Sequence, residues 1–203
     1  MTDTAPSWIE PQPDTTTCGP TCLHALYRHF GEGLTLSDVI DSIHRLDHGG
    51  TLDVFLANDA LRRGYSATIW TYNLNVFDPT WFQDRRIGES NLAGKLHAQM
   101  EAKRDPKLHV ATQGYLQYLR LGGKIRFADL TRALVRTLLA DGHPVLTGLS
   151  ATYLYRSMRE WGPDDADDDI RGLPVGHFVL LTHYDRSRRE VEIADPMQEN
   201  PHG

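Results

Sequence analysis

The sequence has very few cysteines: Cys18 and Cys22 are the only two in 203 residues. They lie four positions apart on one expected helix, where the two Cα atoms are about 6 Å apart and the side chains stack without facing each other. This spacing argues against a disulfide framework, so we expect both residues to be reduced thiols.

Long apolar runs are also missing. Nowhere do about 18 apolar residues follow one another, and the N-terminal residues have acidic character without an apolar core. We therefore expect neither a signal peptide nor an integral membrane segment, and a cytoplasmic location.

The third missing feature is an excess of basic charge. The chain has 21 Lys and Arg residues against 27 Asp and Glu residues, which gives a net charge of −6, and its basic residues are scattered along the sequence. Holding a phosphate backbone requires a concentrated positive field. Nucleic acid is therefore not an expected partner.

What the sequence does contain is the pattern of a mixed helical and β protein. Apolar residues at three- and four-residue intervals predict helices, and runs of β-branched and aromatic residues predict strands. The predicted helices cover residues 19–30, 34–46, 51–61, 91–103, 106–121 and 127–140, and the predicted strands cover residues 65–72, 144–149, 175–184 and 190–194. Because there is no internal repeat and no low-complexity linker, we expect one α+β domain over residues 1–203, with an antiparallel sheet after the helices.

Cys18 lies where a segment of turn-forming residues runs into the first predicted helix. The first turn of a helix has unsatisfied backbone N–H groups and the positive end of the helix dipole, and both favour a thiolate over a thiol. A thiolate is the form that attacks carbonyl carbons. Cys18 is therefore the candidate nucleophile, with a small core residue as the alternative, whereas Cys22 is expected in the core.

Three residues far away in the sequence could complete such a site. His177 starts one strand of the predicted hairpin and Asp195 ends the other, so the hairpin would place them side by side. Gln12, six positions before Cys18, can reach back over the helix start and donate to an oxyanion. Each also has an ordinary interpretation: a structural histidine, a turn-forming aspartate and a turn or surface glutamine.

The sequence gives no pattern for a bound metal. Cys18, Cys22 and His24 do not have tetrahedral zinc-ligand spacing. Residues 164–169 contain five aspartates in six positions, but they lack the alternating ligands and the terminal glutamate of a calcium loop. We expect a solvated surface loop there, and no metal or cofactor in the protein.

Three sequence segments taken together resemble a known family. The order Gln-x5-Cys-Gly-Pro, then a distant Gly-His-Phe-Val-Leu-Leu, then a strand that ends in Ala-Asp-Pro is similar to the papain-like bacteriocin-processing peptidases, the double-glycine peptidase family. The resemblance covers the two ends of the chain. It implies a papain-like fold, with the cysteine on a helix N-terminus in an N-terminal helical part and the histidine and aspartate on a C-terminal antiparallel sheet.

The same resemblance implies a role for each candidate residue: Cys18 as nucleophile, His177 as general base and acid, Asp195 as the residue that orients His177, and Gln12 as oxyanion donor. Members of the family are peptidase domains of ABC exporters or stand-alone proteins, and the acidic stretch 164–169 departs from their pattern as an insertion. An association with a separate transporter or peptide-modifying enzyme is left open.

We therefore expect a cysteine peptidase or amidase that hydrolyses a peptide or amide bond through an acyl-enzyme. Two alternatives stay open at this point. One is a papain-like acyltransferase, in which an amine intercepts the thioester, and the other is an inactive module that binds a peptide.

Overall fold

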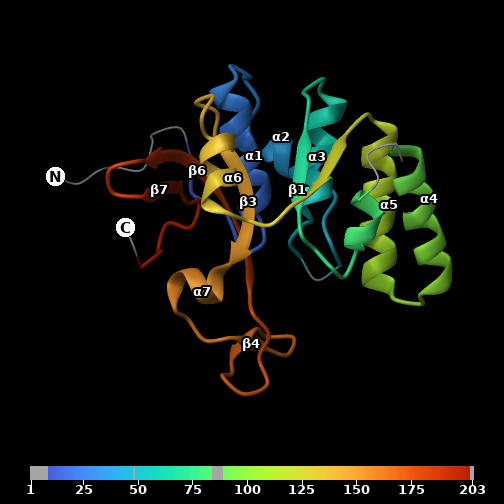
Figure 1. Ribbon diagram of the computed structural model, residues 1–203. Coiled ribbons are helices and arrows are strands. Elements are labelled where there is room, and N and C mark those ends of the chain that lie inside the picture. Colours follow the sequence, from blue (N-terminus) through green and yellow to red (C-terminus); the bar gives the residue numbers. More distant parts are fainter. Residues whose placement is uncertain (1–8, 48, 84–88, 202–203) are drawn as a thin grey trace. The chain divides into compact units, whose positions relative to one another are not determined.

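The computed structural model describes residues 9–47, 49–83 and 89–201 (Figure 1). The chain divides into two compact units: the first combines the residues up to Thr51 with those from Val135 onward, and the second covers Leu52–Leu134. The first unit contains every candidate site residue. The single domain expected from the sequence stays a prediction.

The first unit is built on a three-stranded antiparallel sheet with the order β3–β6–β7, formed by Val145–Ser150, Gly176–Asp185 and Glu190–Ala194. The hairpin predicted over 175–194 is confirmed, because β6 pairs with β7 in antiparallel register. Helix α1 (Cys18–His29) packs on this sheet. The buried cluster between them consists of Cys22, Ala25, Leu180 and Ala194.

Helix α1 ends as the sequence predicts. Gly31 has a φ of 87°, a left-handed conformation that glycine adopts without strain. The N–H of Gly31 donates to the carbonyl of Arg28, and the N–H of Glu32 donates to that of Tyr27. These two bonds form a Schellman motif, which satisfies the last carbonyls of the helix.

Helix α2 (Leu36–Ser42) is shorter than the predicted helix 34–46. Its start agrees with the prediction, because Thr35 and Asp38 form a reciprocal capping box. After Ser42 the backbone becomes extended at Ile43, and the following segment closes as a loop in which the N–H of Leu46 donates to the carbonyl of Gly50. A loop therefore takes the place of the last helical turn that the apolar periodicity had predicted up to residue 46.

The second unit contains α3 (Asp53–Arg62), β1 (Thr68–Thr71), the 3₁₀ turn η1 (Pro79–Phe82), α4 (Glu89–Ala102), α5 (Pro106–Arg120) and β2 (Lys124–Phe127). Strands β1 and β2 pair in parallel. The predicted helix 127–140 is wrong at its start, because Phe127 belongs to β2 and helix α6 (Arg132–Leu138) begins later. The ring of Phe127 stacks on that of Phe82, with 5.3 Å between the ring centres. Contacts with residues distant in the sequence therefore favour a strand at Phe127, where local periodicity predicts a helix.

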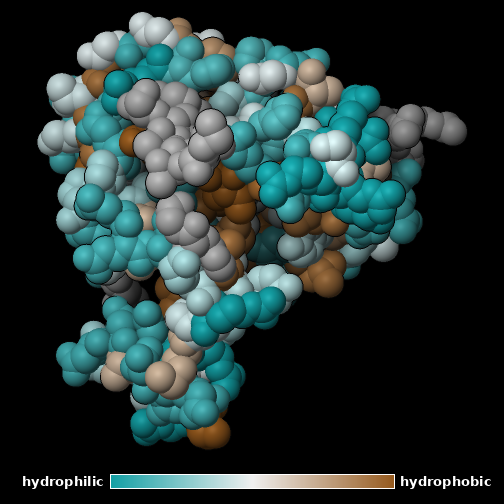
Figure 2. Space-filling view, turned by 90° about the vertical axis from the view of Figure 1, so that its left-hand side faces the viewer, coloured by the Kyte–Doolittle hydropathy of each residue, from teal (hydrophilic) through white to brown (hydrophobic). Residues whose placement is uncertain are grey.

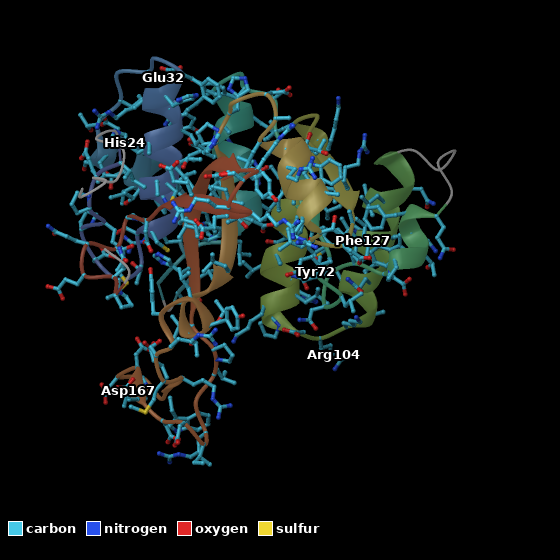
Figure 3. All side chains as sticks on the ribbon, turned by 60° about the vertical axis from the view of Figure 1, so that its left-hand side comes forward. His24, Glu32, Tyr72, Arg104, Phe127 and Asp167 are labelled. Carbon is cyan, nitrogen blue, oxygen red and sulfur yellow. The ribbon has the colours of Figure 1, made fainter. Side chains whose placement is uncertain are left out.

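A short helix and a two-stranded ribbon follow β3 in the first unit. They are α7 (Ala151–Tyr155), β4 (Glu160–Trp161) and β5 (Ala166–Asp167), and α7 and β4 lie beyond one end of β3 (Figure 1). Asp167 lies in this extension (Figure 3). The surface of the part containing β4, at the bottom of Figure 2, is mostly hydrophilic.

The solvated surface loop predicted at 164–169 is exposed over most of its length but contains a short strand, because Ala166 and Asp167 pair with β4. The ribbon places Asp167 opposite Glu160, and burial together with the negative charges of Asp165 and Asp167 raises the pKa of Glu160. Asp168 accepts hydrogen bonds from the backbone and the guanidinium of Arg171, which offsets part of the negative charge. Across the described ranges of the chain, no helix combines the length and the apolar character needed to cross a membrane.

Candidate active site

Cys18 is the first residue of α1, and its side chain is largely buried, with 8% exposed. The N-cap residue is Thr17, and its side chain makes no hydrogen bond to the first turn. Pro20 has no N–H to donate, and the N–H of Thr21 donates to the carbonyl of Thr17. The backbone N–H groups of Cys18 and Gly19 therefore remain at the positive end of the helix dipole.

Cys22 fixes this helix on the sheet. It lies one turn after Cys18, is fully buried, and donates from Sγ to the carbonyl of Phe178 at 3.3 Å. Phe178 follows His177 directly in β6. The contact therefore brings the helix start that carries Cys18 to the strand end that carries His177.

The β6–β7 hairpin brings His177 and Asp195 together, as the sequence predicts. Asp195 follows the last residue of β7, and its Oδ1 lies 2.8 Å from Nε2 of His177. The side chain of His177 is 6% exposed and that of Asp195 is 11% exposed. Since Asp195 occupies Nε2, the other ring nitrogen, Nδ1, is the one left for Cys18.

The environment of this pair favours a charged imidazole. Burial alone would lower the pKa of His177, but hydrogen bonds with Asp195 and Cys18, and the negative charges of both, raise it to about 9. Burial would likewise raise the pKa of Asp195, but the hydrogen bonds from His177, from Tyr155 and from the backbone of Met197 lower it. At neutral pH His177 is therefore an imidazolium held by a carboxylate.

Tyr155 is part of this arrangement and was missed from the sequence. Its hydroxyl donates to Oδ2 of Asp195 at 2.6 Å, and its ring lies 5.8 Å from the ring of His177, tilted by 57°. Helix α7, which carries Tyr155, has only five residues, too few for a periodic signal. The one local sign is Ser150, whose hydroxyl caps the helix by accepting from the N–H of Tyr153.

Gln12 lies at the same end of the hairpin, because its backbone N–H donates to the carbonyl of Pro196 at 2.9 Å. Its side-chain Nε2 donates to the carbonyl of Asp14 at 2.8 Å, while Oε1 is buried without a partner among the described residues. Among the described residues, no hydrogen bond joins the side-chain amide of Gln12 to Cys18 or His177. An amide nitrogen carries two N–H groups, so one donor of Nε2 remains beside the bond to Asp14.

The described residues contain no group of three or more His, Cys, Asp or Glu side chains placed to hold a metal ion. Cys18, His177 and Asp195 can perform nucleophilic chemistry. They supply a thiol at a helix start, an imidazole in contact with it, and a carboxylate that holds the imidazole.

Comparison with known protein families gives one finding that agrees with this chemistry. The model of the Peptidase_C39 like family matches residues 7–203, almost the whole chain. Comparisons with the curated proteins and with the solved structures returned no match. The matched residues include Cys18, His177 and Asp195, and the family suggests a cysteine-peptidase type of function. The chain belongs to the Peptidase_C39 like family.

Proposed function

We propose that the protein is a papain-like cysteine peptidase or amidase that hydrolyses a peptide or amide bond through an acyl-enzyme. Cys18 is the nucleophile, His177 the general base and acid, and Asp195 the residue that orients His177. The observation that carries the proposal is the bond of 2.8 Å between His177 and Asp195, on a histidine that also hydrogen-bonds to the cysteine at the start of α1.

The first step is attack of the Cys18 thiolate on the substrate carbonyl carbon. A bond forms between Sγ and that carbon, and the carbonyl oxygen becomes an oxyanion. The backbone N–H of Cys18, at the helix start, and the remaining N–H of Gln12 Nε2 are the donors assigned to that oxygen. A buried donor is worth most where negative charge develops, because little water is present to screen it.

The second step is loss of the amine. His177, protonated at neutral pH because its pKa is about 9, gives its Nδ1 proton to the leaving nitrogen as the carbon–nitrogen bond breaks. This leaves a thioester on Cys18 and a neutral imidazole. In the third step that imidazole takes a proton from water, the water oxygen attacks the thioester, and a carboxylic acid and the free Cys18 are released.

The reactivity of Cys18 tests the first step without knowledge of the substrate. Iodoacetamide at neutral pH should modify Cys18 at least about tenfold faster than a small free thiol, because it reacts with the thiolate. Cys22 is an internal control in the same chain, since it is fully buried and should remain unmodified in the folded protein. A Cys18 that reacts no faster than the free thiol contradicts the proposal.

Cleavage itself is tested on a peptide library, with products identified by mass spectrometry. Wild-type protein should release new carboxyl termini, and Cys18→Ala should release none, although it should unfold at nearly the same temperature. Adding a primary amine separates hydrolysis from acyl transfer, because transfer would give amides in place of carboxylic acids. A Cys18→Ala variant with full turnover would refute the assignment of the nucleophile.

A further inference from the structure

We propose that Tyr155 is a positioning residue for this reaction: its hydroxyl fixes the rotation of the Asp195 carboxylate, and through it the orientation of His177. This inference rests on the proposed function. It concerns a residue outside the nucleophile, base and carboxylate that define the site.

The two oxygens of Asp195 have different partners. Oδ1 accepts from Nε2 of His177 at 2.8 Å and from the N–H of Met197 at 2.9 Å. Oδ2 accepts from the hydroxyl of Tyr155 at 2.6 Å, the one hydrogen bond found for that oxygen among the described residues. The torsion that rotates an aspartate carboxylate has no sharp rotamer wells, so the partners of the two oxygens must set it.

Tyr155 can set this rotation because its helix is fixed to the strand of His177. The N–H of Ala151, at the start of α7, donates to the carbonyl of Val175 at 2.9 Å. The N–H of Val175 donates in return to Oγ1 of Thr152 at 3.0 Å. One end of α7 therefore binds the chain two residues before His177, and the other end carries the hydroxyl that binds Asp195.

The hydroxyl acts as a donor over the whole working range of pH. Burial and the hydrogen bond to Asp195 raise the pKa of Tyr155 above its usual range, so the phenol keeps its proton. It therefore holds the carboxylate and exchanges no proton with the reacting groups. The ring covers part of His177 in addition, at 5.8 Å between ring centres.

Tyr155→Phe separates the two contributions, because it keeps the ring and removes only the hydroxyl. Without the hydroxyl, the carboxylate keeps only the partners of Oδ1 and can rotate about them, so the proton on His177 is held less firmly. Two effects are expected. First, kcat on a cleaved peptide should fall about tenfold with KM unchanged. Second, the rate of Cys18 alkylation, plotted against pH, should show its alkaline inflection at a lower pH than in the wild type. The probe is iodoacetamide, applied from about pH 6 to about pH 10.

Tyr153→Phe is the matched control. Tyr153 lies on the same helix, its side chain is 71% exposed, and the substitution removes the same atom. It should leave the rates and the alkaline inflection at the wild-type values. Tyr155→Phe should also add nothing in an Asp195→Asn background, because the hydroxyl acts through the carboxylate.

The outcomes separate this inference from the proposed function. A wild-type Cys18 with the reactivity of a free thiol overturns both. A reactive wild-type Cys18 whose alkaline inflection is the same in Tyr155→Phe and Tyr153→Phe overturns only the positioning role, even if Tyr155→Phe melts at a lower temperature. Where Tyr155→Phe does not fold, Thr152→Val supplies the test, because it removes the hydroxyl that accepts from the N–H of Val175 and fixes α7, and it keeps Tyr155. Its inflection should also move to lower pH, and an inflection at the wild-type pH would contradict the positioning role.

Discussion

Replacing Asp195 with asparagine tests how far the negative charge of Asp195 raises the pKa of His177. The substitution keeps the size of the side chain and an oxygen that can accept from Nε2 of His177, but it removes the negative charge. In the native protein, burial lowers the pKa of His177 and is outweighed by the bonds to Asp195 and Cys18. The substitution removes the negative charge of Asp195 and weakens the hydrogen bond to Nε2, two of the causes that oppose burial, so we expect the pKa of His177 to fall.

The expected size of the fall follows from the native value. The pKa of His177 rises from 6.5 to about 9, and this difference equals about 3 kcal/mol of preference for the charged ring. Cys18 still supports the imidazolium in the variant, so we expect the pKa of His177 to lie between its ordinary value of 6.5 and the native value of about 9. A fall of one pH unit, which is about 1.4 kcal/mol, would lower the protonated fraction at about pH 8 from roughly nine-tenths to about one half.

The measurement is the dependence of kcat/KM on pH, which reports the groups of the free enzyme. The imidazolium is present well below its pKa and is lost as the pH rises through it, so wild-type activity should decline above about pH 9. In Asp195→Asn the decline should begin at lower pH. Glu192→Gln removes an exposed charge from β7, the strand that Asp195 follows, and is the control that should keep the wild-type profile. A folded Asp195→Asn variant that still declines near pH 9 refutes the reasoning.

Two further substitutions test the oxyanion donor and the packing. Gln12→Ala should lower kcat about 100-fold and leave iodoacetamide alkylation of Cys18 unchanged, because alkylation forms no oxyanion; equal kcat values would remove Gln12 from the mechanism. Gly123→Ala should lower the free energy of unfolding in urea by about 1–3 kcal/mol, since a Cβ there would lie 2.4 Å from the buried Tyr118 ring. Gly94→Ala, in open space on α4, is its control and should not destabilise the protein.

The parts of the site that the sequence predicts are those set by local patterns. The apolar stripe and Gly31 define α1, and with it the place of Cys18 at a helix start. A polar turn between two β-branched runs defines the hairpin, whose register brings Asp195 to His177. Both features depend on neighbours in the sequence, so a single sequence is enough to find them.

The parts that the sequence misses depend on contacts between distant residues. Strand β2 forms because it pairs in parallel with β1, and the segment that follows carries a helical pattern that hides it. Tyr155 is one of eight tyrosines, and only the placement of α7 against Val175 shows that its hydroxyl meets Asp195. The side chain of Gln12 is a similar case, because its bond to the carbonyl of Asp14 depends on the path of the loop.

One contact explains how two such distant residues as Cys18 and His177 keep a fixed separation. Cys22 and Phe178 are 156 positions apart in the sequence, and the hydrogen bond between them joins α1 to β6 one helical turn from Cys18 and one residue from His177. The two cysteines therefore have different physical tasks, although both are thiols on one helix. The buried Cys22 sets the position of α1 on the sheet, and this position decides whether the thiol of Cys18 lies within reach of the imidazole.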